Sequence, residues 1–332
     1  MKKNTDLIEK ALKRFEAVTG MQVTLQKSPD ASHDELLALK WDKSIAKYQI
    51  VSLNTLTPAT YGQYKLQANK FKYPPIIITS YVSPGMADLL RKAPENYLDT
   101  AGNAFIQSPP LFILIKGNKP EEKPLKTTRM FQPSGLKIIF ALLCNPGLEK
   151  KDYRTIATAS GVALGSIAWV MRDLEQAGYI QSIGKKGRKL TGKDELLKNW
   201  VTNYHDQLRP RILLGRYSSV DENWWKKTSP AGAFLWGSEY AAKVITHYLK
   251  PEKYTLFVEE MDNNLLLSNK LHSTLKGNVD ICKRFWNFED SWIKKGIVPP
   301  LLVYADLISS QSDRNIETAK MIYENELKNL LK

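Results

Sequence analysis

The chain has 332 residues, of which 43% are apolar, so it is long enough for two or three globular domains and is neither a disordered tail nor a minimal scaffold. Its 48 lysines and arginines outnumber its 34 aspartates and glutamates, which gives a formal net charge of +14. This charge favours a polyanionic partner or a strongly solvated surface, and does not by itself choose between them.

The cysteines and the lengths of the apolar stretches indicate the cellular compartment. Cys144 and Cys282 stand far apart, each in an apolar stretch, which is typical of buried thiols in a reducing compartment. Charged residues interrupt the opening stretch before it reaches the length of a signal-peptide core. No stretch approaches the ~20 apolar residues of a membrane span. We therefore expect a soluble cytoplasmic protein.

The first segment, residues 1–118, is predicted to be an α/β domain. An opening helix that Asn4 or Thr5 could cap and Gly20 could end is followed by three strand-like stretches at 21–27, 35–41 and 48–54. Thr57 and Pro58 suit the start of a second helix. The β-branched run at 74–82 suits a strand covered on both faces, and a helix and further strands complete the segment. This order of elements resembles the restriction-endonuclease-like core.

Residues 119–130 hold prolines and charges with little to bury, which predicts a linker. Residues 131–200 are predicted to form a winged helix-turn-helix, and residues 201–332 a mixed α/β domain. That last domain should end in one amphipathic helix that starts near Ser312. The expected fold class is therefore a mixed α/β protein of several domains.

The stretch 157–176 carries the pattern of a helix-turn-helix. Ala157 and Gly161 supply the small residue and the flexible turn that close helix packing requires. An apolar stripe at helical spacing should face inward on the second helix, at Ile167, Val170, Met171 and Leu174. The opposite side then holds the candidates for reading base edges in a major groove, namely Ser166, Arg172 and, if it is not a packing residue, Trp169.

A basic hairpin is predicted after Gly178. Its cations could reach phosphates beside a groove, which would give affinity without sequence selectivity. The phosphate-contacting candidates are Lys185, Lys186, Arg188 and Lys189, with Lys193 close behind. The same features suit a winged helix that contacts only protein, with the cations merely solvated.

Four stretches of the chain resemble the AbiEi family, transcriptional regulators and antitoxins of type IV toxin–antitoxin systems. They are "YLDTAGNAFI" (97–106), the predicted winged helix with its basic hairpin, "WGSEYAAKVITHYL" (236–249) and "LLVYADLISSQSDRNIETAKMIYE" (301–324). The resemblance implies a repressor that binds inverted repeats in double-stranded DNA at its own promoter and opposes a nucleotidyltransferase-like toxin indirectly. It also implies two winged helices per operator, from a homodimer or from two monomers. No membrane partner is expected, because no apolar stretch has the length of a membrane span. Well-known members carry the winged helix at the N-terminus, whereas here about 130 residues precede it.

Nuclease activity in the first segment would require two carboxylates for Mg²⁺ and a lysine that helps to activate water. The third strand has Ser52 and Asn54 where a carboxylate and a lysine are expected, and Asp34 and Glu35 have no partner. We therefore expect an inactive domain without metal or cofactor, used for binding or dimerisation. A metal-dependent DNA nuclease that relies on Asp34 remains the enzymatic alternative.

Other polar and aromatic groups are interpreted as structural. Asp99 and Asn103 suit a turn that binds its own backbone. The four histidines never pair with each other or with cysteine at metal-ligand spacing. The aromatic runs at 224–225 and 234–236 suit core packing, and the alternative is a partner surface. The run 258–262 suits a solvated strand end, and Arg314 beside Asp313 and Glu317 suits helix-end electrostatics.

Overall fold

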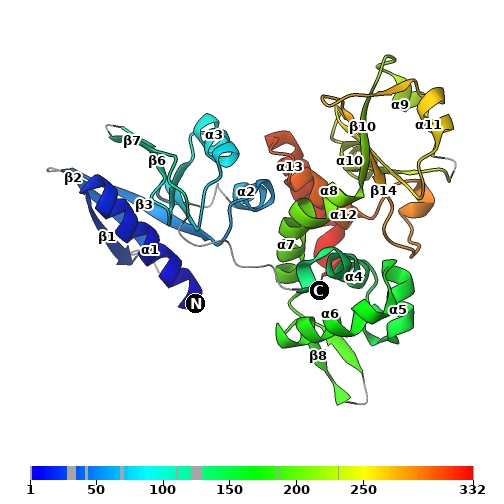
Figure 1. The fold of residues 1–332 in the computed structure, drawn as a ribbon, viewed down its shortest axis with the longest axis horizontal. Coiled ribbons are helices and arrows are strands. Elements are labelled where there is room, and N and C mark those ends of the chain that lie inside the picture. Colours follow the sequence, from blue (N-terminus) through cyan, green and yellow to red (C-terminus); the bar gives the residue numbers. More distant parts are fainter. Residues whose placement is uncertain are drawn as a thin grey trace. The chain divides into compact units, whose positions relative to one another are not determined.

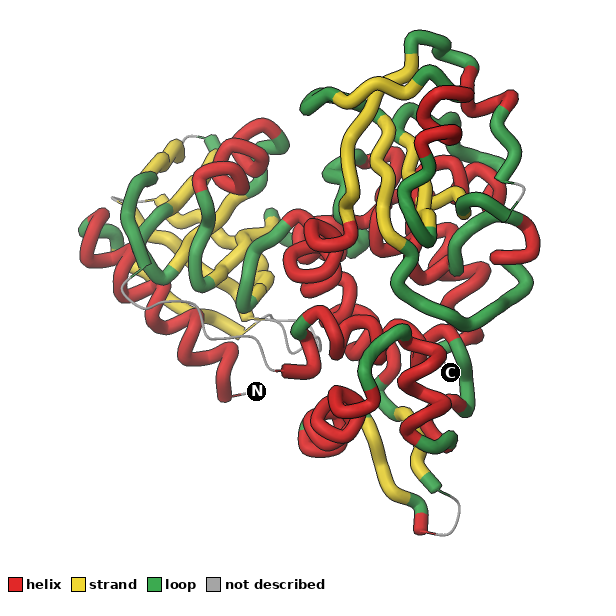
Figure 2. The backbone as a smooth tube through the Cα atoms, turned by 45° about the vertical axis from the view of Figure 1, so that its right-hand side comes forward, coloured by secondary structure: helices red, strands yellow, loops and turns green. Residues whose placement is uncertain are grey.

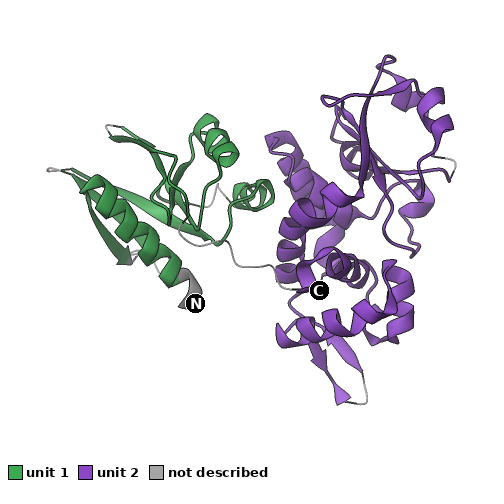
Figure 3. Cartoon of the chain, in the orientation of Figure 1, with its two compact units in different colours: residues 1–125 green, residues 126–332 purple. Residues whose placement is uncertain are grey.

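The structure is a computed structural model that describes residues 2–27, 35–41, 44–67, 71–109, 111–120, 129–184, 187–230 and 232–331. The chain divides into two compact units, Met1–Leu125 and Lys126–Lys332, called unit 1 and unit 2 below (Figure 3). The division falls inside the predicted linker 119–130. Both units combine helices and strands, which confirms the mixed α/β fold class. In the described parts of the chain, no helix combines the length and the apolar character that a membrane crossing needs.

Unit 1 is built on one sheet of seven strands that lie side by side in chain order (Figure 1). The three strands at its centre, β3, β4 and β5, are parallel, and the outer pairs are antiparallel. The strands are β1 (Gln22–Lys27), β2 (Glu35–Trp41), β3 (Ser44–Leu53), β4 (Pro75–Thr79), β5 (Asn96–Asp99), β6 (Ala104–Ser108) and β7 (Leu111–Ile115). The three strands predicted first in the chain are confirmed as β1 to β3.

Three helices cover the two faces of this sheet: α1 (Lys2–Thr19), α2 (Pro58–Lys65) and α3 (Pro84–Lys92). The α1 side chains pack with Ile76 and Ile78 of β4, whereas α2 and α3 pack with Ile77 on the other face. The prediction of a strand covered on both faces is thus confirmed. Helix α2 begins as predicted, with Thr57 as its cap and Pro58 in the first turn. The predicted cap of the first helix is wrong, because α1 begins at Lys2, ahead of both candidate residues.

Unit 2 opens with helices followed by a hairpin, residues 129–190, called the helix–hairpin module below. Its three main helices pack on one another, and two short antiparallel strands follow them. The elements are η2 (Arg129–Phe131), α4 (Pro133–Cys144), η3 (Leu148–Lys150), α5 (Tyr153–Ser160), α6 (Leu164–Gln176), β8 (Ile180–Ser182) and β9 (Arg188–Leu190).

The rest of unit 2 surrounds a five-stranded sheet of order β11-β12-β14-β10-β13, drawn in yellow in Figure 2. Its strands are β10 (Leu213–Ser219), β11 (Leu235–Gly237), β12 (Tyr254–Val258), β13 (Leu271–Ser273) and β14 (Val279–Lys283). Its helices before β12 are α7 (Lys193–Asn203), η5 (Tyr204–Leu208), α8 (Arg209–Ile212), α9 (Trp224–Lys227) and α10 (Ser238–Thr246). Those after β12 are α11 (Asn263–Ser268), η6 (Ile293–Lys295), α12 (Pro300–Ile308), α13 (Asp313–Ile322), η7 (Tyr323–Leu327) and α14 (Lys328–Leu330).

Aromatic packing joins the helix–hairpin module to the rest of unit 2. Phe140 of α4 contacts the rings of Trp200, Phe285, Trp286 and Phe288. The indole N–H of Trp200 also donates a 2.7 Å hydrogen bond to the Leu136 carbonyl. The domain boundary expected after residue 200 therefore falls inside α7, whose buried face belongs to both parts. No composition shift marks this point, because the shared core is apolar on both sides.

Candidate nucleic-acid interface

Helix α5 is bounded by a capping residue at its start and by a glycine at the turn toward α6. Asp152 caps α5, because its carboxylate accepts hydrogen bonds from the backbone N–H and the hydroxyl of Thr155. Gly161 ends α5 with φ of 62°, in the left-handed region. A Cβ at Gly161 would lie 2.8 Å from the Phe285 carbonyl oxygen, so the turn also fits closely against the chain after β14. Ala157 is buried, as predicted.

Helix α6 has one buried and one exposed side. The four residues predicted to face inward are all buried: Ile167, Val170, Met171 and Leu174. Trp169 and Arg172 are exposed, and Ser166 near the helix start is half-buried. All three base-reading candidates therefore lie outside the buried stripe. They stay candidates, since exposure alone assigns no role.

Trp169 is a surface residue rather than a packing residue, since the residue is 52% exposed. The Arg172 guanidinium carbon lies 5.1 Å from the centre of the indole ring, and that of Arg129 lies 5.4 Å from it. Both distances are within the range of cation–π attraction. The three side chains line a hollow of about 550 Å³ together with Met130, Asp173, Gln176 and Ala177. Arg129 is not among the residues predicted from the sequence, because it lies in the predicted linker and no spacing connects it to α6.

The hairpin pairs Ile180 with Leu190 and Ser182 with Arg188. Arg188 turns back onto the module, because its guanidinium donates to the Lys151 carbonyl and lies 4.8 Å from the centre of the Tyr153 ring. Lys189 is exposed. Lys193 belongs to α7 and donates a 3.2 Å hydrogen bond to the Leu330 carbonyl. Lys185 and Lys186 lie outside the described residues.

The residues considered for nuclease chemistry do not form a carboxylate site in the part of unit 1 that the structure describes. Ser52 lies on β3 with its hydroxyl buried and without a hydrogen-bond partner. Asn54 is exposed just beyond this strand, and its carbonyl accepts a 2.6 Å hydrogen bond from the Ser80 hydroxyl. Glu35 is the exposed first residue of β2. Asp34 lies outside the described residues.

Asp99 and Asn103 form the predicted turn. The Asp99 carboxylate accepts hydrogen bonds of 2.8–3.0 Å from the backbone N–H groups of Val82, Ala101 and Asn103, and from the Asn103 amide. Burial raises the pKa of Asp99, and these hydrogen bonds oppose the rise. The Asn103 amide also exchanges hydrogen bonds with the backbone of Asn118. These hydrogen bonds of Asp99 and Asn103 hold the backbone between β5 and β6, which confirms the structural interpretation of the two residues.

The thiols and histidines form no common site among the described residues, where no group of His, Cys, Asp and Glu is placed to hold a metal ion. Cys282 is buried, as expected, and burial raises its pKa to about 12. Cys144 is half-buried rather than buried, since it ends α4. His33 lies outside the described residues.

The aromatic runs at 224–225 and 234–236 belong mainly to the core of unit 2. Trp224, Phe234 and Trp236 are at most 4% exposed, and Trp224 and Trp236 both pack against the ring of Tyr254. The packing interpretation is confirmed. The acidic run after β12 is exposed, also as predicted.

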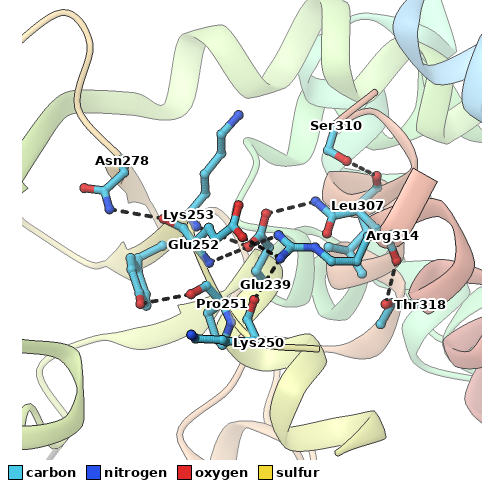
Figure 4. A network of polar contacts seen from close by, with 12 residues as sticks. Glu239, Lys250, Pro251, Glu252, Lys253, Asn278, Leu307, Ser310, Arg314 and Thr318 are labelled. Carbon is cyan, nitrogen blue, oxygen red and sulfur yellow. Dashed lines mark hydrogen bonds and ion pairs between the residues drawn. The ribbon is translucent and has the colours of Figure 1, made fainter. Parts of the chain in front are cut away.

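A buried carboxylate, Glu239 of α10, centres a polar network in unit 2 (Figure 4). It accepts hydrogen bonds from the backbone N–H groups of Glu252 and Lys253 and from the Asn315 amide, at 2.7–3.2 Å. Arg314 forms a 3.3 Å ion pair with it. The expected helix-end role of Arg314 is therefore wrong, since its partners are Glu239 and Glu252 in distant parts of the sequence. Sequence spacing gave no signal for this pairing.

The part of unit 2 that contains this network matches a known family. Residues 189–328 match the AbiEi family model. The model is described as transcriptional regulator, AbiEi antitoxin, type IV toxin–antitoxin system, and it confirms the resemblance over this range. The AbiEi match includes the last two residues of β9 and the stretches 236–249 and 301–324, but not α4 to α6, β8 or unit 1. No curated protein and no solved structure matches the chain.

The AbiEi match supports a transcriptional regulator or antitoxin of a type IV toxin–antitoxin system, for which DNA and a toxin are the suggested partners. This family is one of regulators and antitoxins rather than of enzymes.

Proposed function

We propose that the chain is a DNA-binding autorepressor and antitoxin that binds inverted repeats at its own promoter. Its helix–hairpin module acts as a winged helix, and α6 enters a major groove. The regulator opposes a nucleotidyltransferase-like toxin without a stable complex. The observation that carries this proposal is the outward side of α6, where Trp169 and Arg172 lie beside Arg129 on a hollow surface.

The chemistry of this surface suits nucleic acid. Arginine donates in a planar fork that matches the two acceptors of guanine in the major groove. An exposed indole contributes a flat apolar surface that fits against thymine methyl groups or sugars. Arg172 and Ser166 are the base-reading residues in this proposal. Lys189, with Lys185 and Lys186, contacts phosphates.

Fluorescence anisotropy of the full chain tests the proposal, on DNA from upstream of its own gene and on a scrambled duplex, with Mg²⁺ present. Tight binding to the upstream DNA alone, with the DNA intact afterwards, is the expected result. Equal weak binding to both duplexes would contradict sequence-specific regulation. Cleaved DNA would instead favour a nuclease.

The residue-level test replaces Arg172 by alanine. Selectivity between the two duplexes should fall by about 1–3 kcal/mol, as expected for the loss of one bidentate base contact. Arg211, exposed on α8, provides a matched control with the same change in charge. If Arg172→Ala and Arg211→Ala weaken binding to both duplexes equally, Arg172 reads no base.

A further inference from the structure

The seven-stranded sheet of unit 1 ends in two edge strands of different character. Strand β1, at one edge, has polar residues at alternate positions: Gln22, Thr24 and Gln26. Strand β7, at the other edge, reads Leu-Phe-Ile-Leu-Ile and has no polar residue (Figure 1). Edge strands normally avoid uncontrolled pairing by means of charges, prolines or bulges. The absence of any such residue within β7 indicates an edge that has a partner.

The two sides of β7 differ in burial. Leu111, Ile113 and Ile115 pack against the core beneath α1. Phe112 and Leu114 point to the other face and are 62% and 39% exposed. Phe112 contacts the buried Phe105 of β6 edge-on, with ring centres 6.0 Å apart. The exposed side chains therefore extend the apolar core of that face outward to the edge of the sheet.

The backbone of β7 is also available for pairing. In an antiparallel pair, alternate N–H and C=O groups point away from the neighbouring strand. Among the described residues, β6 is the only strand that pairs with β7. The outward N–H and C=O groups of β7 can therefore form backbone hydrogen bonds with a further strand.

We propose that β7 pairs antiparallel with β7 of a second copy of this chain, around a two-fold axis at Ile113. The sequence is self-complementary in this register. Phe112 lies opposite Leu114 of the second copy on the exposed face, and Leu111 lies opposite Ile115 on the other. Every cross-strand pair is then apolar, and contacts of this kind stabilise antiparallel pairs. The interface is isologous, as in most homodimers.

The nearest charges are compatible with this arrangement. Lys116 directly follows β7 and is exposed. In the proposed register the two copies of Lys116 lie six positions apart along the paired strands, which is about 20 Å at ~3.3 Å per residue. Repulsion is weak at that distance, since the Debye length is about 8 Å at physiological salt. No acidic partner is therefore needed to neutralise them.

Sedimentation of the full chain across the micromolar range, without DNA, tests the proposal independently of any DNA-binding activity. The wild-type chain should form a dimer, and Phe112→Lys should raise its dissociation constant at least about tenfold, because the lysine faces Leu114 of the other copy. Leu25→Lys, at a similarly exposed position on β1, is the matched control and should leave the dimer intact. Thermal unfolding establishes that both variants are folded.

The register of the proposed β7 pairing is tested by placing charged residues at positions that face each other across the two-fold axis. Leu114→Glu alone should also weaken the dimer. Phe112→Lys combined with Leu114→Glu places opposite charges across the axis twice and should restore it. A monomeric wild type would overturn the proposal and leave β7 free for a different protein. A dimer that persists in Phe112→Lys, an equal loss in Leu25→Lys, or a double variant no better than the single ones would also overturn it.

Discussion

Gly161 meets two structural demands at one residue. Its φ of 62° is costly for any residue with a Cβ, and a Cβ there would lie only 2.8 Å from the Phe285 carbonyl oxygen. Replacement by alanine should therefore lower the free energy of unfolding of unit 2 by about 2 kcal/mol or more, from backbone strain and overpacking together. Denaturant unfolding monitored by intrinsic fluorescence measures this, since Trp41 is the only tryptophan in unit 1.

Gly165 provides the control for that change. It lies within α6, and a Cβ there would meet nothing within 4 Å. Gly165→Ala should stabilise unit 2 by about 0.5–1 kcal/mol, because alanine loses less backbone entropy in a helix. Equal effects of the two substitutions would show that the contact with Phe285 is unimportant for stability.

Glu239 and Glu252 share one partner, Arg314, but differ in burial. The Glu239 side chain is 3% exposed and that of Glu252 is 70% exposed. Glu239→Ala leaves the Glu252 and Lys253 N–H groups and the buried Asn315 amide without this acceptor, and removes one of the two carboxylates that Arg314 contacts. It should therefore destabilise unit 2 by about 3 kcal/mol or more. Glu252→Ala should cost less than about 1 kcal/mol, since an exposed ion pair contributes little. Urea midpoints of the two variants compare them, and similar losses would rule out a central role for Glu239.

At the scale of the element, Arg188 and Lys189 are neighbours on β9 with different expected roles. Arg188 holds the hairpin onto the start of α5, so Arg188→Ala should destabilise unit 2 by about 1 kcal/mol. Lys189 is exposed, so Lys189→Ala should leave stability unchanged and weaken binding to every DNA sequence alike. For this variant, the slope of the logarithm of the binding constant against the logarithm of the salt concentration should become less steep by about 0.9, the value for one phosphate contact. An unchanged slope would remove Lys189 from the interface.

Most elements could be predicted from the sequence because their signals are local. The inward stripe of α6, the Thr57 and Pro58 start of α2 and the buried run of β4 each follow from periodicity or capping within a few residues. Contacts between distant segments could not be predicted in this way. Gly161 was expected to shape a turn, but its close approach to Phe285 depends on a segment more than a hundred residues away.

The same limit applies to the candidate site. Trp169 and Arg172 lie on one helix, and their spacing placed both opposite the apolar stripe. Arg129 joins them from a segment that the sequence describes only as charged and rich in proline. Arg314 was assigned to its own helix end, because the local acids are visible in the sequence whereas Glu239 is 75 residues away. Patterns within an element were reliable here, and partners across elements were not.

For the whole molecule, the two units allow separate measurements of stability. Unit 2 contains seven of the eight tryptophans, so its unfolding dominates the fluorescence signal. The DNA-binding candidates all lie in unit 2, and the proposed dimer strand lies in unit 1. Loss of dimerisation through Phe112→Lys should therefore leave the fluorescence-monitored transition of unit 2 unchanged.

The pH dependence of that transition should contain a contribution from His205. Burial of the imidazole lowers its pKa below the ordinary value of 6.5, Arg209 adds to this, and Asp206 opposes it. The unfolded chain then takes up a proton more readily than the folded one. The stabilising contribution of neutral His205 is complete above the unfolded pKa and is lost as the pH falls through it toward the folded pKa. The free energy of unfolding of unit 2 should therefore contain a term that decreases below about pH 6.5.

A comparison of two histidine variants separates the contribution of His205 to the pH dependence of stability from that of carboxylates, which titrate at lower pH. His205→Gln should flatten the decline in the denaturation midpoint between about pH 7.5 and pH 5.5, because the variant has no imidazole to protonate on unfolding. His272→Gln, the same change at an exposed position, is the matched control. Parallel pH profiles for wild type and His205→Gln would mean that burial of His205 makes no contribution to the stability of unit 2.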